Sequence, residues 1–206
     1  MGDDLRPDID GWARAHGFDP SDDQIGGTTP LLRLGMLDTT DATYRGTIDG
    51  RDAILAEFSV GSPDWSEAFA ASGIRSSGFT LLLIFVDASP WPRLTVHPSR
   101  FNDHDWARRL LGADHRVHTL SERMDERYRV VASARIGADR LGRLFTPELI
   151  EWWLAQESEV LVDVEDHGDG AGFLTVAQLG IGIGDEALTT LQGQASHLLA
   201  AFAAVT

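Results

Sequence analysis

Cysteine is absent from this chain of 206 residues, which excludes disulfide bonds, thiolate metal sites and a cysteine nucleophile. Basic residues are also scarce. The 17 lysine and arginine residues are outnumbered by 32 aspartate and glutamate residues, and the formal net charge is -15. A surface with this charge repels phosphate backbones and anionic lipid headgroups. We therefore expect neither nucleic-acid nor membrane partners.

Long hydrophobic runs and targeting signals are missing as well. The longest apolar run, 79–86, is too short to cross a bilayer as a helix. The N-terminal segment "MGDDLRPDID" has no basic stretch followed by an apolar run, so we expect no signal peptide. Hydrophobic residues make up 43% of the chain, which is enough to bury a substantial core. A soluble, cytoplasmic protein with one domain over residues 1–206 is expected.

Apolar periodicity divides the chain into four parts. A helix and loop occupy 1–27, a first group of strands 28–100, and an irregular or weakly helical segment 101–120. The remainder, 121–206, holds a strand, a pair of helices, a hairpin and a long C-terminal helix. This order predicts an α+β fold, with an antiparallel sheet of about 6–8 strands, helices on one face and the long helix at the C-terminus.

Three features of the first strand group can be predicted more closely. Alternation over 42–60 indicates a hairpin, and its apolar residues fall at even positions in both strands. A three-residue loop, Ile48 to Gly50 with Gly50 at positive φ, would bring these two sets onto one face. The apolar run 79–86 predicts a central strand covered on both faces. Prolines at both ends of the segment "PRLTVHP", 92–98, predict that it is an edge strand.

The segment "LFTPELIEWWL", 144–154, has the signals of a helix start followed by a wide apolar face. Thr146 is a good N-cap and Pro147 suits the first helical position. Leu149, Ile150, Trp153 and Leu154 share one face, so we interpret this face as core. Trp152 lies at the border of the face and is the candidate interaction residue. Acidic neighbours disfavour base stacking on it.

Histidine and aspartate side chains cluster between 97 and 118, at His97, Asp103, His104, Asp105, Asp114, His115 and His118. Such ligands could hold zinc or a harder divalent ion, and a metal-activated water would make the protein a hydrolase. The spacing fits no established motif, and the segment is typical of a solvated loop. We expect no metal or other cofactor, but His104, His115 and His118 are the ligands if a metal site exists.

Two other polar segments have structural explanations. Glycines at 180–184, before the C-terminal helix, weakly resemble a phosphate-binding loop, but Asp185 and Glu186 would complement the helix N-terminus themselves. Carboxylates cluster around the second hairpin, at Asp163, Glu165, Asp166 and Asp169. We expect a solvated hairpin tip there.

The C-terminal helix carries one continuous apolar stripe, formed by Leu188, Leu191, Ala195, Leu198, Phe202 and Val205. Gln192, Gln194 and His197 lie off this stripe. Docking onto the sheet of the same chain is the favoured interpretation. A weak homodimer through the helix is the alternative to a monomer.

The order of segments, above all "SERMDERYRVVASARIGADRLGRLFTPELIEWWL", resembles actinobacterial proteins of unknown function related to the DUF3137 group. The likeness covers most of residues 9–180. Positions that match the family segment are Glu122, Met124, Tyr128, Val130, Leu144, Phe145, Pro147, Leu149, Ile150 and Trp153. The resemblance implies a related fold. The family supplies no established activity and no catalytic residue.

These observations favour a non-catalytic domain that acts as a protein-interaction module or regulatory scaffold, because each polar cluster has a simpler structural explanation. No catalytic residue is therefore assigned. A metal-dependent hydrolase built on His97 to His118 is one alternative. The other is a small-molecule or lipid carrier, with a cavity between the sheet and the C-terminal helix lined by Phe58, Phe85, Phe173 and Phe202.

Overall fold

A computed structural model describes residues 9–23, 39–59, 78–87, 93–99, 115–132, 136–157, 160–166, 171–179 and 183–204. They form a nine-stranded sheet in the order β1-β2-β3-β4-β9-β8-β5-β7-β6, and all pairings are antiparallel. The strands are β1 (Asp19–Pro20), β2 (Thr39–Ile48), β3 (Arg51–Ser59), β4 (Gly78–Asp87), β5 (Leu94–Pro98), β6 (His115–Val117), β7 (Tyr128–Ala132), β8 (Val160–Asp166) and β9 (Ala171–Leu179). The helices are α1 (Ile9–Ala15), α5 (Glu122–Arg127), α6 (Ala138–Leu144), α7 (Pro147–Ala155) and α8 (Asp185–Ala203).

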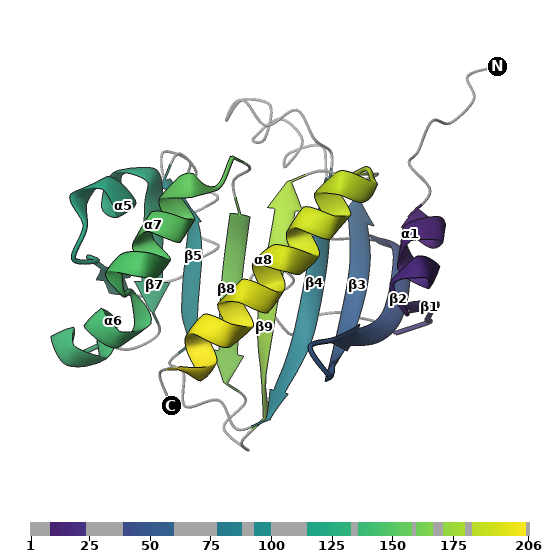
Figure 1. The fold of residues 1–206 in the computed structure, drawn as a ribbon, viewed down its shortest axis with the longest axis horizontal. Coiled ribbons are helices and arrows are strands. Elements are labelled where there is room, and N and C mark those ends of the chain that lie inside the picture. The colour runs from purple at the N-terminus through teal and green to yellow at the C-terminus, as the bar shows by residue number, and fades with distance from the viewer. Residues whose placement is uncertain are drawn as a thin grey trace.

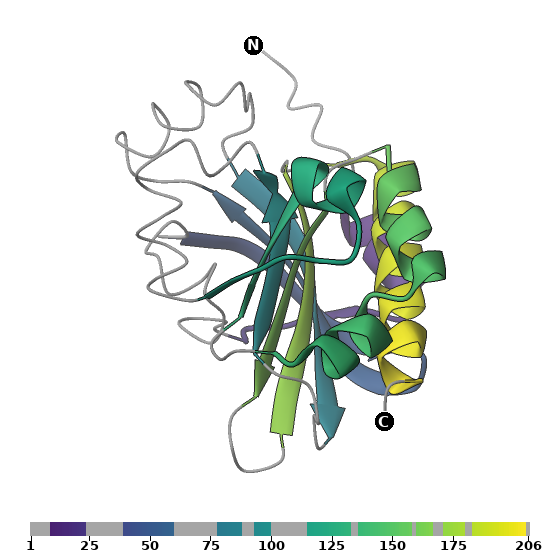
Figure 2. The same ribbon diagram turned by 90° about the vertical axis from the view of Figure 1, so that its left-hand side faces the viewer.

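The helices gather on one face of the sheet, where each of them contributes to a single hydrophobic core. α8 crosses this face diagonally and α7 lies beside it (Figures 1 and 2). The predicted α+β class, antiparallel sheet and long C-terminal helix are confirmed. The strand number exceeds the prediction slightly because β1 and β6, with two and three residues, are also part of the sheet.

Strand register aligns alternate residues into rows that cross the sheet beneath the helices. One row is apolar throughout and runs through Leu55, Leu82, Val176, Val162, Val96 and Val130. The next row toward one end of the sheet contains Glu57, Thr80 and Gln178, which are all buried. The helix-facing surface therefore changes from apolar to polar toward that end of β3, β4 and β9.

The central strands are also buried on the face away from the helices. Ile54, Phe58, Leu81 and Leu83 alternate with the helix-facing residues, and each has 5% of its surface exposed or less. β4 lies between β3 and β9, so the apolar run 79–86 belongs to a central strand covered on both faces, as predicted.

The prediction of a three-residue loop between β2 and β3 is wrong. Ile48 pairs with Arg51, and the two turn residues Asp49 and Gly50 have φ angles of 49° and 76°. Positive φ at both positions is the pattern of a type I′ hairpin turn. This register sets even-numbered residues of β2 beside odd-numbered residues of β3, and the even-numbered apolar residues of β3 face the other side. Burial on both faces makes that arrangement stable.

The prediction that 92–98 forms an edge strand is also wrong, because β5 lies between β8 and β7. Pro98 is the last residue of β5, where it pairs with Tyr128 of β7. The pairing of β5 with β8 extends only to Val96. A proline at the end of a strand removes no hydrogen bond from the middle of the ladder, so it is compatible with a central position.

The segment before β7 is more regular than predicted. β6 lies at the edge of the sheet within the stretch expected to be irregular, and residues 101–114 of that stretch lie outside the described residues. Helix α5 precedes β7, where the sequence pattern predicted a strand but no helix. Ser121 caps this helix, since its hydroxyl oxygen accepts a hydrogen bond from the Met124 N–H at 3.3 Å. The buried side chain of Met124 anchors the helix to the core.

The apolar stripe of α8 docks onto the sheet of its own chain. Leu188, Leu191, Ala195, Leu198 and Phe202 are each no more than 2% exposed. Burial stabilises the packed helix by roughly 1.5–3 kcal/mol for each large side chain. A homodimer through α8 would therefore have to use the outer face of the helix. Among the described residues, no helix combines the length and the apolar character needed to span a bilayer.

Candidate binding groove

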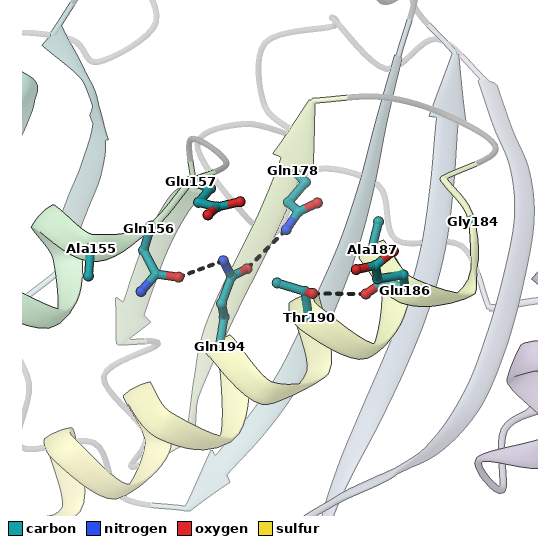
Figure 3. Close-up of a pocket in the computed structure, with 9 residues that line it drawn as sticks. All are labelled: Ala155, Gln156, Glu157, Gln178, Gly184, Glu186, Ala187, Thr190 and Gln194. Atoms are coloured by element: carbon teal, nitrogen blue, oxygen red, sulfur yellow. Dashed lines mark hydrogen bonds between the residues drawn. The ribbon is translucent and has the colours of Figure 1, made fainter.

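A groove opens where the C-terminal end of α7, strand β9 and the first turns of α8 meet (Figure 3). Its volume is about 570 Å³. The residues that line it are Ala155, Gln156, Glu157, Gln178, Gly184, Glu186, Ala187, Thr190 and Gln194. They come from three segments that are far apart in the sequence, so only the folded chain assembles the groove.

Three glutamine side chains form a chain of hydrogen bonds along the groove (Figure 3). The Nε2 of Gln178 donates to the Oε1 of Gln194 at 3.1 Å. The Nε2 of Gln194 donates to the Oε1 of Gln156 at 3.0 Å. Gln156 in turn donates to the backbone carbonyl of Trp152 at 2.7 Å. This amide chain links β9 to α8 and α8 to α7.

The direction of the amide chain follows from its last acceptor. A backbone carbonyl can only accept, so the Gln156 atom that faces Trp152 must be the nitrogen. The Oε1 of Gln156 then faces Gln194, which must donate through its Nε2, and the Oε1 of Gln194 in turn accepts from the Nε2 of Gln178. Gln178 therefore turns its nitrogen toward Gln194, and its carboxamide oxygen points away from Gln194 (Figure 3).

Burial explains why these glutamines are hydrogen bonded. Gln178 and Gln194 are 6% and 4% exposed, and a buried amide without partners destabilises a fold by roughly 1–3 kcal/mol. Gln178 belongs to the polar row of the sheet, and Gln194 faces this row from α8. The interpretation of Gln194 as a residue off the buried face of its helix is therefore corrected.

The two charged residues that line the groove are both acidic. Glu157 and Glu186 line it with exposed carboxylates, and none of its nine lining residues is basic. Gly184 caps α8 without a side-chain hydrogen bond, and Asp185 and Glu186 supply the acidic first turn. Amides donate and accept hydrogen bonds but carry no proton that titrates near neutral pH. The groove is thus equipped to recognise a ligand by hydrogen bonds and charge.

Trp152 is connected to the groove by its backbone carbonyl, which accepts a hydrogen bond from the lining residue Gln156. Its half-buried ring stacks on His197 of α8, with centroids 4.5 Å apart and planes 12° from parallel. Burial lowers the pKa of His197, which favours its neutral form in this stack. Trp153, by contrast, is fully buried and packs edge-on against Tyr128 at 5.0 Å. The two tryptophans therefore have different environments.

The proposed metal ligands are only partly within the described residues. His104 lies outside them, and for His115 only the backbone, in β6, is described. His118 is exposed, and its Nδ1 lies 3.2 Å from the Oδ2 of Asp125. Across the described parts of the chain, no group of three or more metal-binding side chains converges.

Polar residues near the second hairpin are buried rather than solvated, so the expectation for Asp163 and Glu165 is corrected. They lie in β8 and are 1% and 3% exposed. Thr95 of the neighbouring β5 donates to the Oδ1 of Asp163 at 2.9 Å. His97 is also buried, and burial lowers its pKa to about 4. All four side chains are on the sheet face away from the helices. The hairpin tip, 167–170, lies outside the described residues, and for Asp166 only the backbone is described.

The four phenylalanines expected to line a carrier cavity are split between the two faces of the sheet. Phe202 packs in the core beneath α8. Phe85 and Phe173 contact each other edge-on at 5.0 Å on the opposite face, which Phe58 shares. These four side chains therefore cannot enclose one common cavity.

Comparison with protein-family models, with curated proteins and with solved structures finds no significant match to this chain. The resemblance to the DUF3137 group stays a prediction. Sequence reasoning missed all three groove glutamines, because each is unremarkable within its own segment. The one available signal was a polar residue, Gln194, within one turn of the stripe residues Leu191 and Leu198 on α8.

Proposed function

We propose that this protein is a non-catalytic binding domain that holds a partner protein at the groove between α7, β9 and α8. The amide chain is the observation that carries this proposal. It fixes three donor–acceptor groups in one orientation beside a groove of about 570 Å³. Pre-oriented hydrogen-bonding groups suit recognition, because little freedom is lost when a ligand binds.

The Trp152–His197 stack extends this surface beyond the groove. Aromatic residues with one exposed edge are enriched at protein interfaces. Trp152 is half-buried and joined to the groove by Gln156, so a partner could contact both at once. The interaction role expected for Trp152 is thus part of the same proposal. The proposal also includes a cytoplasmic location, which cell fractionation would test.

Site-specific photo-crosslinking in the native host tests the proposal. A crosslinking amino acid is placed at Glu157, on the groove rim, or at the exposed Glu126 of α5 as a control. We expect a discrete adduct from position 157 that disappears when Ala187→Trp fills the groove. Equal adducts at both positions, or none at position 157, would contradict a partner-binding groove.

A carrier of small molecules is the second candidate. The groove volume of about 570 Å³ falls within the range of small-molecule sites, roughly 300–1,000 Å³. The groove also lies between the sheet and the C-terminal helix. Native mass spectrometry of freshly purified protein separates the candidates. A retained small ligand that Ala187→Trp removes would favour the carrier over the partner-binding domain.

The hydrolase alternative rests on residues that are mostly outside the described part of the chain, and elemental analysis tests it directly. One bound equivalent of zinc or manganese in the purified protein, lost in His115→Ala, would replace the binding-domain proposal. A metal content near zero in both proteins would remove the alternative.

A further inference from the structure

We infer that partner binding at the groove is controlled from helix α5, because Arg127 holds the α7 wall of the groove in position without being one of its lining residues. This inference rests on the proposed partner-binding function and concerns the regulation of that same site. Arg127 is a positioning residue that acts through Gln156. Binding should therefore depend on a contact between two helices that lies outside the groove.

The C-terminal end of α7 relies on side chains for its hydrogen bonds. The last carbonyl groups of a helix find no N–H partner within the helix, and α7 has no basic residue in its last turn. The Nε2 of Gln156 donates to the carbonyl of Trp152. Arg127 of α5 donates to the carbonyls of Leu154 and Gln156. The end of α7 is therefore fixed by α5 as well as by its own residues.

Arg127 reaches α7 with two separate N–H donors. Its Nη1 donates to the Leu154 carbonyl at 2.6 Å, and its Nη2 donates to the Gln156 carbonyl. The planar guanidinium can hold both carbonyls at once, and its charge is favourable at the negative end of the helix dipole. The Cζ also lies 5.6 Å from the ring centroid of buried Tyr128. The guanidinium is thus placed by a core residue as well as by α7.

Helix α5 has a fixed position from which Arg127 can act. Thr119 donates to the Oδ1 of Asp125 with its N–H at 2.9 Å and with its hydroxyl at 2.7 Å. The side chain of Met124 is fully buried in the core. α5 also packs against α7 at one end of the sheet (Figure 1). The contact between Arg127 and α7 therefore joins two elements that are both anchored.

Gln156 carries the effect of Arg127 to the groove. Its backbone carbonyl accepts from Arg127, whereas its side-chain Oε1 accepts from the Nε2 of Gln194 at 3.0 Å. Glu157, which also lines the groove, is the next residue in the chain. Loss of the Arg127 contact frees the end of α7, and with it two lining residues and one member of the amide chain.

Two substitutions on α5 separate this role from a general loss of charge. Arg127→Met removes the donors to the α7 carbonyls, whereas Arg123→Met removes an exposed ion pair that also joins α5 to α7. We expect Arg127→Met to move the side-chain amide NMR signals of Gln156 and Gln194. The indole N–H signal of Trp12, bonded to α8 far from α5, should stay in place in both variants and report an intact fold. Arg123→Met should leave all these signals unchanged.

Photo-crosslinking from position 157 in the native host then measures binding in each variant. The yield of the adduct should fall about tenfold in Arg127→Met, the range of one hydrogen bond to a charged group. Arg123→Met should give the yield of the unaltered chain. Urea unfolding of both variants shows that each is folded under the conditions of the crosslinking.

Arg127→Lys tests for rescue, and it decides the question if Arg127→Met does not fold. An ammonium keeps the charge but lacks the planar fork that holds two carbonyls together. We expect an adduct yield between those of Arg127→Met and the unaltered chain. The chain has no lysine of its own, so an amine-reactive reagent reads the introduced amine separately from the N-terminus. This amine should react more slowly in the folded chain than in urea. A folded Arg127→Lys variant without an adduct would overturn the inference.

The outcomes separate this inference from the proposed function. If Arg127→Met leaves the amide signals or the adduct yield unchanged, Arg127 does not position the groove, although the groove remains a partner site. An equal loss from Arg123→Met would overturn the inference as well, because any change of charge on α5 would then suffice. No adduct from the unaltered chain would overturn the proposed function and its regulation, whereas the amide signals would still report whether Arg127 positions Gln156.

Discussion

Acidification should destabilise this protein, because unfolding exposes a histidine that the fold keeps neutral. His97 is 2% exposed in β5, and its Nδ1 lies 3.0 Å from the carbonyl oxygen of Pro98. Burial is the main cause that lowers its pKa from 6.5 to about 4, and the positive charge of Arg129 on the adjacent strand lowers it further. The Pro98 carbonyl opposes these effects in part, because it accepts from the protonated ring.

The sign and size of the effect follow from this difference in pKa. Between pH 6.5 and about 4 the unfolded chain binds a proton at His97 that the folded chain does not. Stability from this group is therefore fully present above pH 6.5 and is lost progressively as the pH falls through that window. At about 1.4 kcal/mol for each pH unit, the loss amounts to about 3 kcal/mol.

Urea unfolding at pH 7.5, 5.5 and 4.0 measures this loss, and His97→Gln isolates it from the carboxylates. Gln keeps polar atoms at the position but cannot be protonated in this range. The free energy of unfolding should fall more steeply with acid in the wild type than in the variant, and the two slopes should differ by about 3 kcal/mol over the window. Parallel pH profiles would refute the argument that burial keeps His97 neutral.

Four further predictions concern stability, each measured by reversible chemical unfolding. Trp153→Ala should cost about 3–5 kcal/mol, as expected for a fully buried ring, and Trp152→Ala clearly less; equal costs would mean that both rings belong to the core. Gly46→Ala should cost about 1–3 kcal/mol, because its methyl group would lie 2.7 Å from the Gly17 carbonyl oxygen and the Phe18 ring. Gly193→Ala, in an open position on α8, should stabilise by about 0.5–1 kcal/mol, and a loss there would contradict the helix assignment. Gln194→Leu should cost about 1–3 kcal/mol, because it leaves the amides of Gln178 and Gln156 without their shared partner; an unchanged free energy of unfolding would show that water replaces the amide chain.

Helix α7 could be predicted from the sequence because its signals are local. Thr146 accepts a hydrogen bond from the Leu149 N–H at 3.3 Å, and Pro147 occupies the first turn. Periodicity assigned Leu149, Ile150, Trp153 and Leu154 to the core; the first three are buried and Leu154 is half-buried against the core. The half-buried position of Trp152 also followed from its place at the border of this face.

The β2–β3 register could not be predicted in this way, because it depends on what covers each face of the sheet. The predicted three-residue loop requires one buried face, which would hold the even-numbered residues of β3. In the structure Leu55 faces the helices while Ile54 and Ala56 are buried on the other side. Alternation alone does not reveal two-sided burial when both sets of a strand are apolar.

Buried carboxylates were misjudged for a related reason. Asp163 and Glu165 belong to an acidic stretch that resembles a solvated turn, yet they alternate with Val162 and Val164 along β8. Alternation of acidic residues with valine indicates a strand. It does not indicate whether the sheet face that carries the acidic side chains is buried or exposed to solvent. The hydrogen bond that buried Asp163 accepts comes from Thr95, which is 68 residues away in the sequence.

The position of the groove follows from the alternation that also builds the core. Where the helix-facing rows of the sheet are apolar, α8 presents Leu198 and Phe202 and the two surfaces close together. At the polar row α8 presents Gln194, so the contact there consists of hydrogen bonds whose geometry requires specific distances and directions. Leucines at positions 178 and 194 would pack without a preferred direction, whereas the hydrogen bond between Gln178 and Gln194 holds α8 in one register on β9. The hydrogen bond from Gln194 to Gln156 fixes α7 relative to α8 in the same way. The groove therefore lies at the polar end of the interface between α8 and the sheet, where the amide hydrogen bonds hold its residues in place. The same alternation of side chains along the strands determines both the apolar core and the position of the groove.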